Sequence, residues 1–200
     1  MTKAMNQHIK EQLDAISPLR HNTWNQLMEI SAQLTISKSE NLTDIGKYFN
    51  YEVFVLEGVL RMYHVTSDCK EYTMSFYKEG EFVAPSFTRQ SHGRSLLNIQ
   101  ALENCSVLIF EEKKFTELRY KFRDLLVLGN KVSEKELMLK SKKEVLLATG
   151  NLKNLYYFFK SNHPNLESRI AQRHIASYLG ADPVSLSRLK ARILKENENT

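Results

Sequence analysis

The sequence is poor in the residues on which several kinds of protein depend. It has two cysteines, Cys69 and Cys105, too few for a four-cysteine zinc or iron–sulfur site. No stretch approaches the ~18 apolar residues that a membrane-spanning helix needs, and the first eight residues contain no apolar signal core. We therefore expect a cytoplasmic protein with no membrane partner, in which both cysteines stay reduced and fill small apolar spaces.

Sequence motifs that identify common enzymes are absent as well. The chain has no His-x-His followed by glutamate, no Gly-x-Ser-x-Gly and no Gly-x-x-x-x-Gly-Lys. These patterns supply metal ligands, an exposed nucleophile and a phosphate-binding loop. We predict that the protein is not an enzyme and has neither catalytic residues nor a metal site.

What the sequence does contain is clearest near the C-terminus, where residues 169–193 predict two short helices joined by a sharp turn. Gly180 suits the turn, because glycine adopts a positive φ at little cost. Asp182 can cap the second helix through its side-chain oxygen, and Pro183 suits the first helical position. This pattern is typical of a helix-turn-helix.

The predicted second helix has an apolar face and a basic face. Its apolar residues recur at helical spacing and are Leu186, Leu189 and Ile193. The opposite face is expected to point outward, and its members are Val184, Arg188, Ala191 and Lys195. A short helix with an outward basic face suits the major groove of DNA.

Most of the positive charge lies in the same part of the chain. The formal net charge is +5, and residues 151–200 contribute +4 of it, from eight lysines and arginines and four acidic residues. The basic face of the predicted second helix can also be the ordinary solvated surface of an amphipathic helix. A basic module on a nearly neutral body favours phosphate binding, so we predict double-stranded DNA as a partner.

Between about Lys38 and Phe110 the sequence alternates in short segments separated by glycines, which predicts antiparallel β structure. The best example is residues 51–65, where Glu57-Gly58 separates two runs of β-forming residues. Many short strands of this kind indicate a roll or barrel. Before them, residues 6–16 and 22–34 have the spacing of two helices.

After Phe110 the apolar spacing changes to a seven-residue repeat, which predicts a long helix. Its seam consists of Leu125, Val132, Leu139 and Leu146, with Met138, Val145 and Leu152 on an adjoining row. The seam can pack on the chain's own β domain, or pair with the same helix of a second subunit as in a coiled coil. We favour the second possibility and predict a homodimer, since helix-turn-helix proteins commonly bind two-fold sites as dimers.

Two sets of short segments carry a more specific pattern. The first is Arg173-His-Ile-Ala-Ser-Tyr-Leu-Gly180 followed by Leu186-Ser-Arg-Leu189. The second runs through the β region in the order Gly46, Glu57-Gly-Val-Leu-Arg61, Lys70-Glu71, Gly80-Glu-Phe82 and Ile99-Gln-Ala-Leu-Glu103. Together these segments resemble the Crp/Fnr family of bacterial transcription regulators over nearly the whole chain.

The resemblance implies an α+β fold in three parts. Residues 1–123 would hold the first helices and an antiparallel β-roll, a double-stranded β-helix or jelly-roll like that of cyclic-nucleotide-binding domains. Residues 124–148 would form a long dimerisation helix, and residues 149–200 a helix-turn-helix domain. Family members often continue into a β-hairpin wing, which we do not expect here after Lys195. The resemblance also implies contact with RNA polymerase.

The resemblance further assigns residues to DNA. Arg188 matches the base-contacting arginine of the family, whose planar fork can bond guanine O6 and N7. Val184 stands at an acidic base-reading position, so the preferred sequence should differ from that of the best-known members. The other predicted contacts, mostly to phosphate, are Gln172, Arg173, Ser185, Ser187, Arg192 and Lys195. Asp182 would repel phosphate, so helix capping is its expected role.

The expected ligand pocket departs from the family. Cyclic-nucleotide binders have a Gly-Glu pair that holds the ribose, and here the pair reads Ala84-Pro85. Alignment on Ile99-Gln-Ala101 puts Ser95 rather than Arg94 at the phosphate-binding arginine, a slip that turns the side chain to the other face unless a bulge restores it. Cyclic AMP is therefore not the expected ligand, and a small-molecule effector stays unidentified. Its candidate contacts are Glu81, Phe82, Ser86, Phe87, Arg94 and Ser95.

Other possibilities remain open. Family members also sense signals through iron–sulfur clusters, for which there are too few cysteines, or through haem, for which the sequence selects no histidine ligand. From another class, an adaptor protein without specific DNA readout could use the long helix as a docking surface. The adaptor does not explain Arg188 or the basic C-terminal part, so we favour the regulator.

Overall fold

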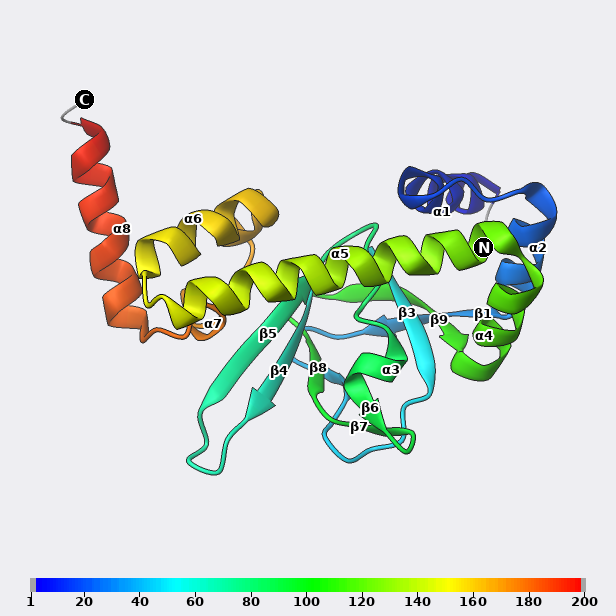
Figure 1. Ribbon diagram of the computed structural model, residues 1–200, viewed down its shortest axis with the longest axis horizontal. Coiled ribbons are helices and arrows are strands. Elements are labelled where there is room, and N and C mark those ends of the chain that lie inside the picture. The colour runs from blue at the N-terminus through cyan, green and yellow to red at the C-terminus, as the bar shows by residue number, and fades with distance from the viewer. Residues whose placement is uncertain (1–2, 199–200) are drawn as a thin grey trace. The chain divides into compact units, whose positions relative to one another are not determined.

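The computed structural model describes residues 3–198, and all their side chains except those of Lys3, Ala4, Phe87, Asn197 and Glu198. The chain divides into two compact units, and the division passes through a β-hairpin and a long helix (Figure 1). We call Met1–Met62 with Phe76–Leu137 the roll unit, and Tyr63–Ser75 with Met138–Thr200 the C-terminal unit.

The order of elements is that of an α+β protein, as predicted. The roll unit contains α1 (Lys3–Ile16), α2 (His21–Glu29), β1 (Ser31–Ile36), β2 (Asn41–Thr43), β3 (Tyr51–Glu57), α3 (Ser86–Arg89), β6 (Gln90–Ser91), β7 (Arg94–Ser95), β8 (Asn98–Ala101), β9 (Cys105–Glu111) and α4 (Glu112–Lys121). Elements shared by the units are β4 (Leu60–Val65), β5 (Glu71–Tyr77) and α5 (Arg123–Ala148). The C-terminal unit adds α6 (Leu152–Asn162), the 3-10 helix η1 (Leu166–Ser168), α7 (Gln172–Tyr178) and α8 (Pro183–Glu198).

The predicted antiparallel β-roll is present. One sheet has the strand order β1-β9-β3 and another β2-β8-β4-β5, while β6 and β7 form a short hairpin. β9 lies between two antiparallel neighbours, with Ser31 of β1 opposite Phe110 and Tyr51 of β3 opposite Glu111. The central strand therefore fixes the register of the first sheet.

Two apolar clusters fill the roll unit, and β9 contributes to both because alternate side chains of a strand point to opposite faces. Leu108 and Phe110 belong to one cluster, whereas Cys105 and Val107 belong to the other. The first cluster also receives side chains from α1, α2, α4 and the start of α5. Cys105 fills a small apolar space as expected, but Cys69 is exposed in the turn after β4, so the same prediction is wrong for Cys69.

The turn between β3 and β4 requires glycine. Gly58 has φ +88°, and a Cβ at this position would lie 2.6 Å from Cys105 Sγ and 2.7 Å from the Asn104 carbonyl oxygen. A larger residue would meet both a strained backbone angle and a packing clash. The break predicted at Glu57-Gly58 is thus confirmed.

The predicted helix over residues 22–34 is wrong in its second half. α2 ends at Glu29, and Ser31–Ile36 forms β1, which pairs with β9 along its whole length. The apolar spacing around Leu34 fits a helix or a strand, and pairing with the central strand β9 makes this segment a strand. The roll therefore begins at Ser31 rather than near Lys38.

The C-terminal unit is built on α6, α7 and α8 around aromatic side chains. Phe159 of α6 is fully buried, and its ring centre lies 5.8 Å from that of Tyr178 and 5.5 Å from that of His163. α8 continues to Glu198, the last residue that the structure describes, so the expectation of no wing lies outside the described residues. None of the helices in the described part of the chain is long and apolar enough to span a membrane.

Candidate nucleic-acid interface

The turn between α7 and α8 has the geometry that the sequence predicts. Gly180 has φ +64°, and α8 begins at Pro183. Asp182 accepts hydrogen bonds from the Ser185 hydroxyl at 2.6 Å and the Ser185 backbone N–H at 2.9 Å. These two bonds lower the pKa of Asp182, as expected for a carboxylate at a helix N-terminus. The predicted capping role is confirmed, and it engages the hydroxyl of Ser185.

The two faces of α8 separate as the helical spacing predicts. Leu186, Leu189 and Ile193 are buried. Val184 is 57% exposed, and the other exposed residues of the outward face are Ser187, Arg188, Ala191, Arg192 and Lys195. The helix is anchored by one side and offers the other side to a partner.

Three arginines of the C-terminal unit have guanidinium groups without a partner among the residues that the structure describes. Arg188 is exposed and forms no hydrogen bond or ion pair with any residue that the structure describes. Arg192, one turn further along α8, and Arg173, in the first turn of α7, have the same properties within residues 3–198. Gln172, beside Arg173, is half-buried at the first position of α7. These groups can bind an external anion without breaking an internal bond.

Two nearby lysines are engaged within the unit. Lys190 Nζ lies 2.5 Å from Glu167 Oε1, and Lys153 Nζ lies 2.6 Å from Glu196 Oε2. The Tyr156 hydroxyl also donates to Glu167, at 2.9 Å. Burial opposes ionisation of Glu167, yet the bonds from Lys190 and Tyr156 hold the pKa of this carboxyl below its usual value. The charge count from sequence therefore overstates the number of free cations, because composition does not reveal ion pairs.

Sequence reasoning also missed a neighbour of the outward face. Arg188 and Arg192 line an open recess together with residues 149–153, which connect α5 to α6. Asn151 in this connection caps α6 by accepting a hydrogen bond from the Asn154 N–H at 3.1 Å. The Asn151 side chain and the helix that follows it are sequence signals of a cap, but no local signal places them beside α8.

A contact between the β4–β5 hairpin and the helices was likewise not predicted. Ser177 of α7 accepts a hydrogen bond from the Thr73 N–H at 2.8 Å and donates one to the Glu71 carbonyl oxygen at 2.7 Å. Lys143 of α5 is buried, and it donates to the carbonyl oxygens of Thr73 and the next residue at 3.0 Å each. We call these four residues, Glu71, Thr73, Lys143 and Ser177, the hairpin clasp. The clasp ties the start of β5 to α5 and α7.

The predicted effector contacts lie in different surroundings. Arg94 is exposed, where its guanidinium lies 4.2 Å from the centre of the Tyr48 ring and donates to the Gly46 carbonyl oxygen at 2.8 Å. Ser95 is buried, and its hydroxyl donates to the Leu97 carbonyl oxygen at 2.6 Å. Adjacent positions of β7 thus send their side chains to opposite sides, as strand geometry requires.

Three of the remaining effector candidates are also engaged within the protein. Glu81 Oε1 lies 2.9 Å from Lys135 Nζ. Phe82 is buried in the first apolar cluster. Ser86 is buried and donates from its hydroxyl to Glu52 at 2.7 Å, while the side chain of Phe87 lies outside the described part of the structure. The described residues contain no group of three or more histidine, cysteine, aspartate or glutamate side chains that could hold a metal ion.

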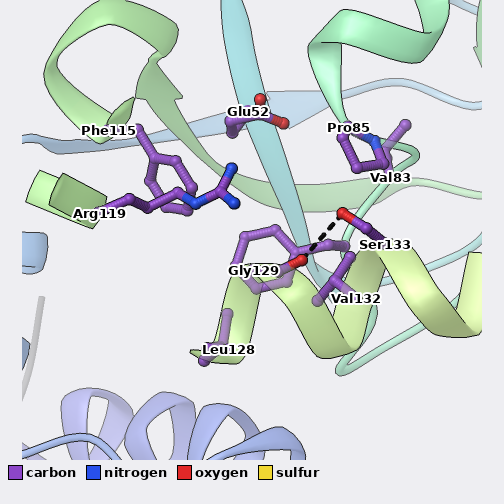
Figure 2. A pocket seen from close by; sticks show the side chains of 10 residues that line it. Glu52, Val83, Pro85, Phe115, Arg119, Leu128, Gly129, Val132 and Ser133 are labelled. Atoms are coloured by element: carbon purple, nitrogen blue, oxygen red, sulfur yellow. Dashed lines mark hydrogen bonds between the residues drawn. The ribbon is translucent and has the colours of Figure 1, made fainter. Parts of the chain in front are cut away.

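A pocket in the roll unit brings together residues that the sequence did not connect. Its cavity volume is about 20 Å³, which is room for about one water molecule. Figure 2 shows the Arg119 side chain extending from α4 into the space between Phe115, Glu52 and Gly129. The full lining is Glu52, Phe82, Val83, Pro85, Phe115, Arg119, Leu128, Gly129, Val132 and Ser133. Of the predicted effector contacts, Phe82 is the one in this lining.

The apolar residues of α5 fall into two groups. Leu125 is buried in the first cluster of the roll unit, and Val132 packs against the same cluster. Leu137, Met138 and Val145 are 68%, 50% and 62% exposed. The start of the predicted seam therefore packs on the chain's own domain, whereas the exposed apolar residues further along lie mainly on the adjoining row.

Known proteins share this architecture. Residues 33–121 match the family model of the cyclic nucleotide-binding domain. The structure of FixK2 from Bradyrhizobium japonicum has 16% sequence identity and a TM-score of 0.70, covering 84% of this chain and 86% of that one. The c-di-GMP responsive global regulator CLP from Xanthomonas campestris has 15% identity and a TM-score of 0.70, covering 89% and 93%.

A transcriptional regulator from Thermotoga maritima has 25% identity and a TM-score of 0.53, covering 62% of this chain and 97% of that one. No curated protein matches the chain in sequence. The similarity therefore lies mainly in the fold, and it extends over most of the chain for FixK2 and CLP. It agrees with the order of parts expected from the sequence.

Proposed function

We propose that this chain is a dimeric, sequence-specific DNA-binding regulator rather than an enzyme. It has the fold of the Crp/Fnr transcription regulators, and its residues 33–121 match the cyclic nucleotide-binding domain. The fold supports a regulator of transcription. Specific DNA readout rests on one observation: Arg188 is exposed on the outward face of α8 and is unpaired within the described residues. RNA polymerase is a further partner that the resemblance implies.

Base readout is assigned to the first two turns of α8. Arg188 has two N–H groups in one plane that can donate to O6 and N7 of a guanine in the major groove. Val184 precedes it by one turn on the same face and is 57% exposed. An apolar side chain there suits the methyl group of a thymine, so the preferred half-site combines a guanine with a nearby thymine.

Phosphate contacts are assigned to Arg173 and Arg192. Both are exposed and unpaired within residues 3–198, so neither has to leave an internal partner. Contacts of this kind position the protein and supply salt-dependent affinity without sequence preference. Lys190 is excluded from this role as long as Glu167 holds it at 2.5 Å.

Dimerisation is assigned to the exposed apolar residues of α5. Leu137, Met138 and Val145 are each at least half exposed, at 68%, 50% and 62%. Contact with the same helix of a second subunit would remove this apolar surface from water, which is favourable. A two-fold dimer would present two copies of α8 to successive major grooves, about 34–36 Å apart.

The roll is proposed to work without the usual cyclic AMP contacts. Pro85 replaces the ribose-binding carboxylate of the family, and Arg94 lies in solvent against Tyr48. Ser95, at the phosphate position, is buried and bonded to a backbone carbonyl. Calorimetry with cyclic AMP tests this point, and saturable micromolar binding would contradict it.

Selection of bound sequences from random duplex DNA tests the readout. The wild type should enrich a two-fold site with a guanine in each half, and Arg188→Ala should lose about 1–3 kcal/mol of preference at that position. Arg192→Ala is the matched control in the same helix. It should weaken all sequences alike and reduce the dependence of affinity on salt by about one phosphate contact.

Two results would reject the proposal. Equal enrichment of every sequence by the wild type would exclude specific readout and favour the adaptor. A preference that is unchanged in Arg188→Ala would show that another residue reads the bases.

A further inference from the structure

We propose that Lys143 sets the distance between the two DNA half-sites that the dimer accepts. It does so as a positioning residue, by fixing α7, and with it the start of α8, to the part of α5 that carries exposed apolar residues. This inference rests on the proposed function, because it needs a dimer that presents two copies of α8 to DNA. The residues that carry it all belong to the C-terminal unit.

Lys143 lies where β5, α5 and α7 meet. Its side chain is buried, although lysine is seldom buried in proteins unless it is paired. The ammonium group donates hydrogen bonds to the carbonyl oxygens of Thr73 and Met74 at 3.0 Å each. Its Nζ also lies 3.6 Å from the centre of the ring of Tyr178, the last residue of α7. One side chain therefore holds a strand of the hairpin and the end of α7 at the same time.

A second contact on the same face of α5 fixes the turn before α8. A Cβ on Gly180 would lie 3.3 Å from Leu147 Cδ2, so this turn packs closely on α5. Leu147 follows Lys143 by four residues, and positions four apart lie on one face of a helix. α8 begins at Pro183, directly after the turn. The direction in which α8 leaves the unit is therefore set next to these two contacts.

The exposed apolar residues of this part of α5 lie on another side of the helix. Met138 and Val145 are separated by one heptad and are 50% and 62% exposed, whereas Lys143 is 8% exposed. Val145 follows Lys143 by two residues, and positions two apart do not face the same way. This stretch of α5 thus holds the proposed dimer surface on one side and α7 on the other. In a two-fold dimer it determines how far apart the two copies of α8 lie.

The spacing of the two helices has to match the pitch of DNA. Successive major grooves on one side of the duplex lie about 34–36 Å apart. One base pair added between the half-sites moves them by about 3.4 Å and turns them by about a tenth of a helical turn. A fixed junction at Lys143 cannot follow this change, whereas a loose junction follows it but has to be ordered on binding. Lys143 should therefore affect the two-fold site and not the readout of one half-site.

Fluorescence anisotropy with the full-length protein and four labelled duplexes tests the proposal. The first duplex carries the two-fold site selected from random DNA. The second and third carry the same half-sites with one and with two base pairs added between them, and the fourth carries a single half-site. In the wild type, two added base pairs should weaken binding by about tenfold or more, because one copy of α8 loses its base contacts.

Lys143→Met keeps a long unbranched side chain and removes the charge and the donors. It should weaken binding to the two-fold site by about tenfold, because the two copies of α8 are correctly placed in a smaller fraction of the molecules. Two added base pairs should then change its affinity by less than about threefold, and the single half-site should bind within about twofold of the wild type. Lys113→Met is the matched control, since it makes the same change at an exposed position of α4 and should behave like the wild type.

Ser177→Ala decides the matter if Lys143→Met does not fold or is not a dimer in sedimentation velocity. This substitution removes two hydrogen bonds between α7 and the hairpin and leaves α5 unchanged. It should reduce the effect of two added base pairs by about threefold relative to the wild type.

The proposal is overturned if the folded, dimeric Lys143→Met variant keeps the spacing preference of the wild type. It is also overturned if this variant weakens the single half-site as much as the two-fold site, or if Lys113→Met relaxes the spacing equally. A wild type that enriches no two-fold site would reject the proposed function itself. A two-fold site whose spacing preference survives in both Lys143→Met and Ser177→Ala would reject only the role of Lys143, so the two failures are distinguishable.

Discussion

Replacement of Ser177 by alanine should destabilise the C-terminal unit by about 1–2 kcal/mol. The hydroxyl forms two hydrogen bonds with the backbone of the hairpin clasp, with the Thr73 N–H at 2.8 Å and the Glu71 carbonyl oxygen at 2.7 Å, and it lies 3.1 Å from the Thr73 hydroxyl. A net contribution of about 0.5–1.5 kcal/mol per bond gives a loss of about 1–3 kcal/mol. Alanine is the better helix former by about 0.5 kcal/mol, and water reaches the half-buried site, so the lower part of that range applies.

Urea unfolding followed by far-ultraviolet circular dichroism measures this loss. Ser187→Ala is the matched control, because it makes the same change on α8 at an exposed hydroxyl that has no partner within the described residues. The control should leave the free energy of unfolding unchanged or raise it slightly. If both variants have the same free energy of unfolding, the clasp does not stabilise the unit and the reasoning is wrong.

Three further predictions follow from the structure. Gly58→Ala should lower the free energy of unfolding by about 2–5 kcal/mol, through both the strained φ and overpacking. Gly46 has φ +81° and no atom within 4 Å of a Cβ built there, so Gly46→Ala should lower it by about 1–2 kcal/mol. Equal losses of the two variants in urea unfolding would contradict the packing argument. Asp182→Ala should lower stability at neutral pH and have less effect in acid. The folded pKa of Asp182 lies below the unfolded value of 3.8, so its contribution is present above that pH and is lost as the pH falls through the folded pKa; a destabilisation independent of pH would exclude this cause. Met138→Glu should separate the dimer in sedimentation velocity, while Lys113→Glu, a charge change at an exposed position of α4, should not; a dimer that survives Met138→Glu would exclude this surface.

The helix-turn-helix could be predicted from the sequence because its signals are local. Gly180, Asp182 and Pro183 act on the backbone within a few residues of themselves, and the buried stripe of α8 needs no more than helical spacing. The same reasoning predicted the turn at Gly58, although the sequence could not reveal that Cys105 packs against this glycine. Local chemistry thus predicts where an element starts and turns.

Other features depend on contacts between distant parts of the chain. Residues 31–36 have no strong local preference, and their place beside β9 makes them a strand. The clasp joins Thr73 to Ser177 across 104 positions. The pairing of Lys190 with Glu167 removes a cation that a charge count includes. None of these contacts has a sequence signal at either partner, so they become visible only in the folded chain.

Arg94 and Arg119 show why the type of a residue does not define a binding site. The sequence favours Arg94, because it stands one position from the phosphate-binding arginine of the family. In the roll unit, Arg94 has an aromatic ring and a carbonyl oxygen as partners and lies in water, where an added anion gains little. Arg119 has a buried Nε without a partner, apolar neighbours and a glycine that makes room for it. The surroundings of a guanidinium, and not its place in the sequence alone, therefore decide how strongly its charge acts.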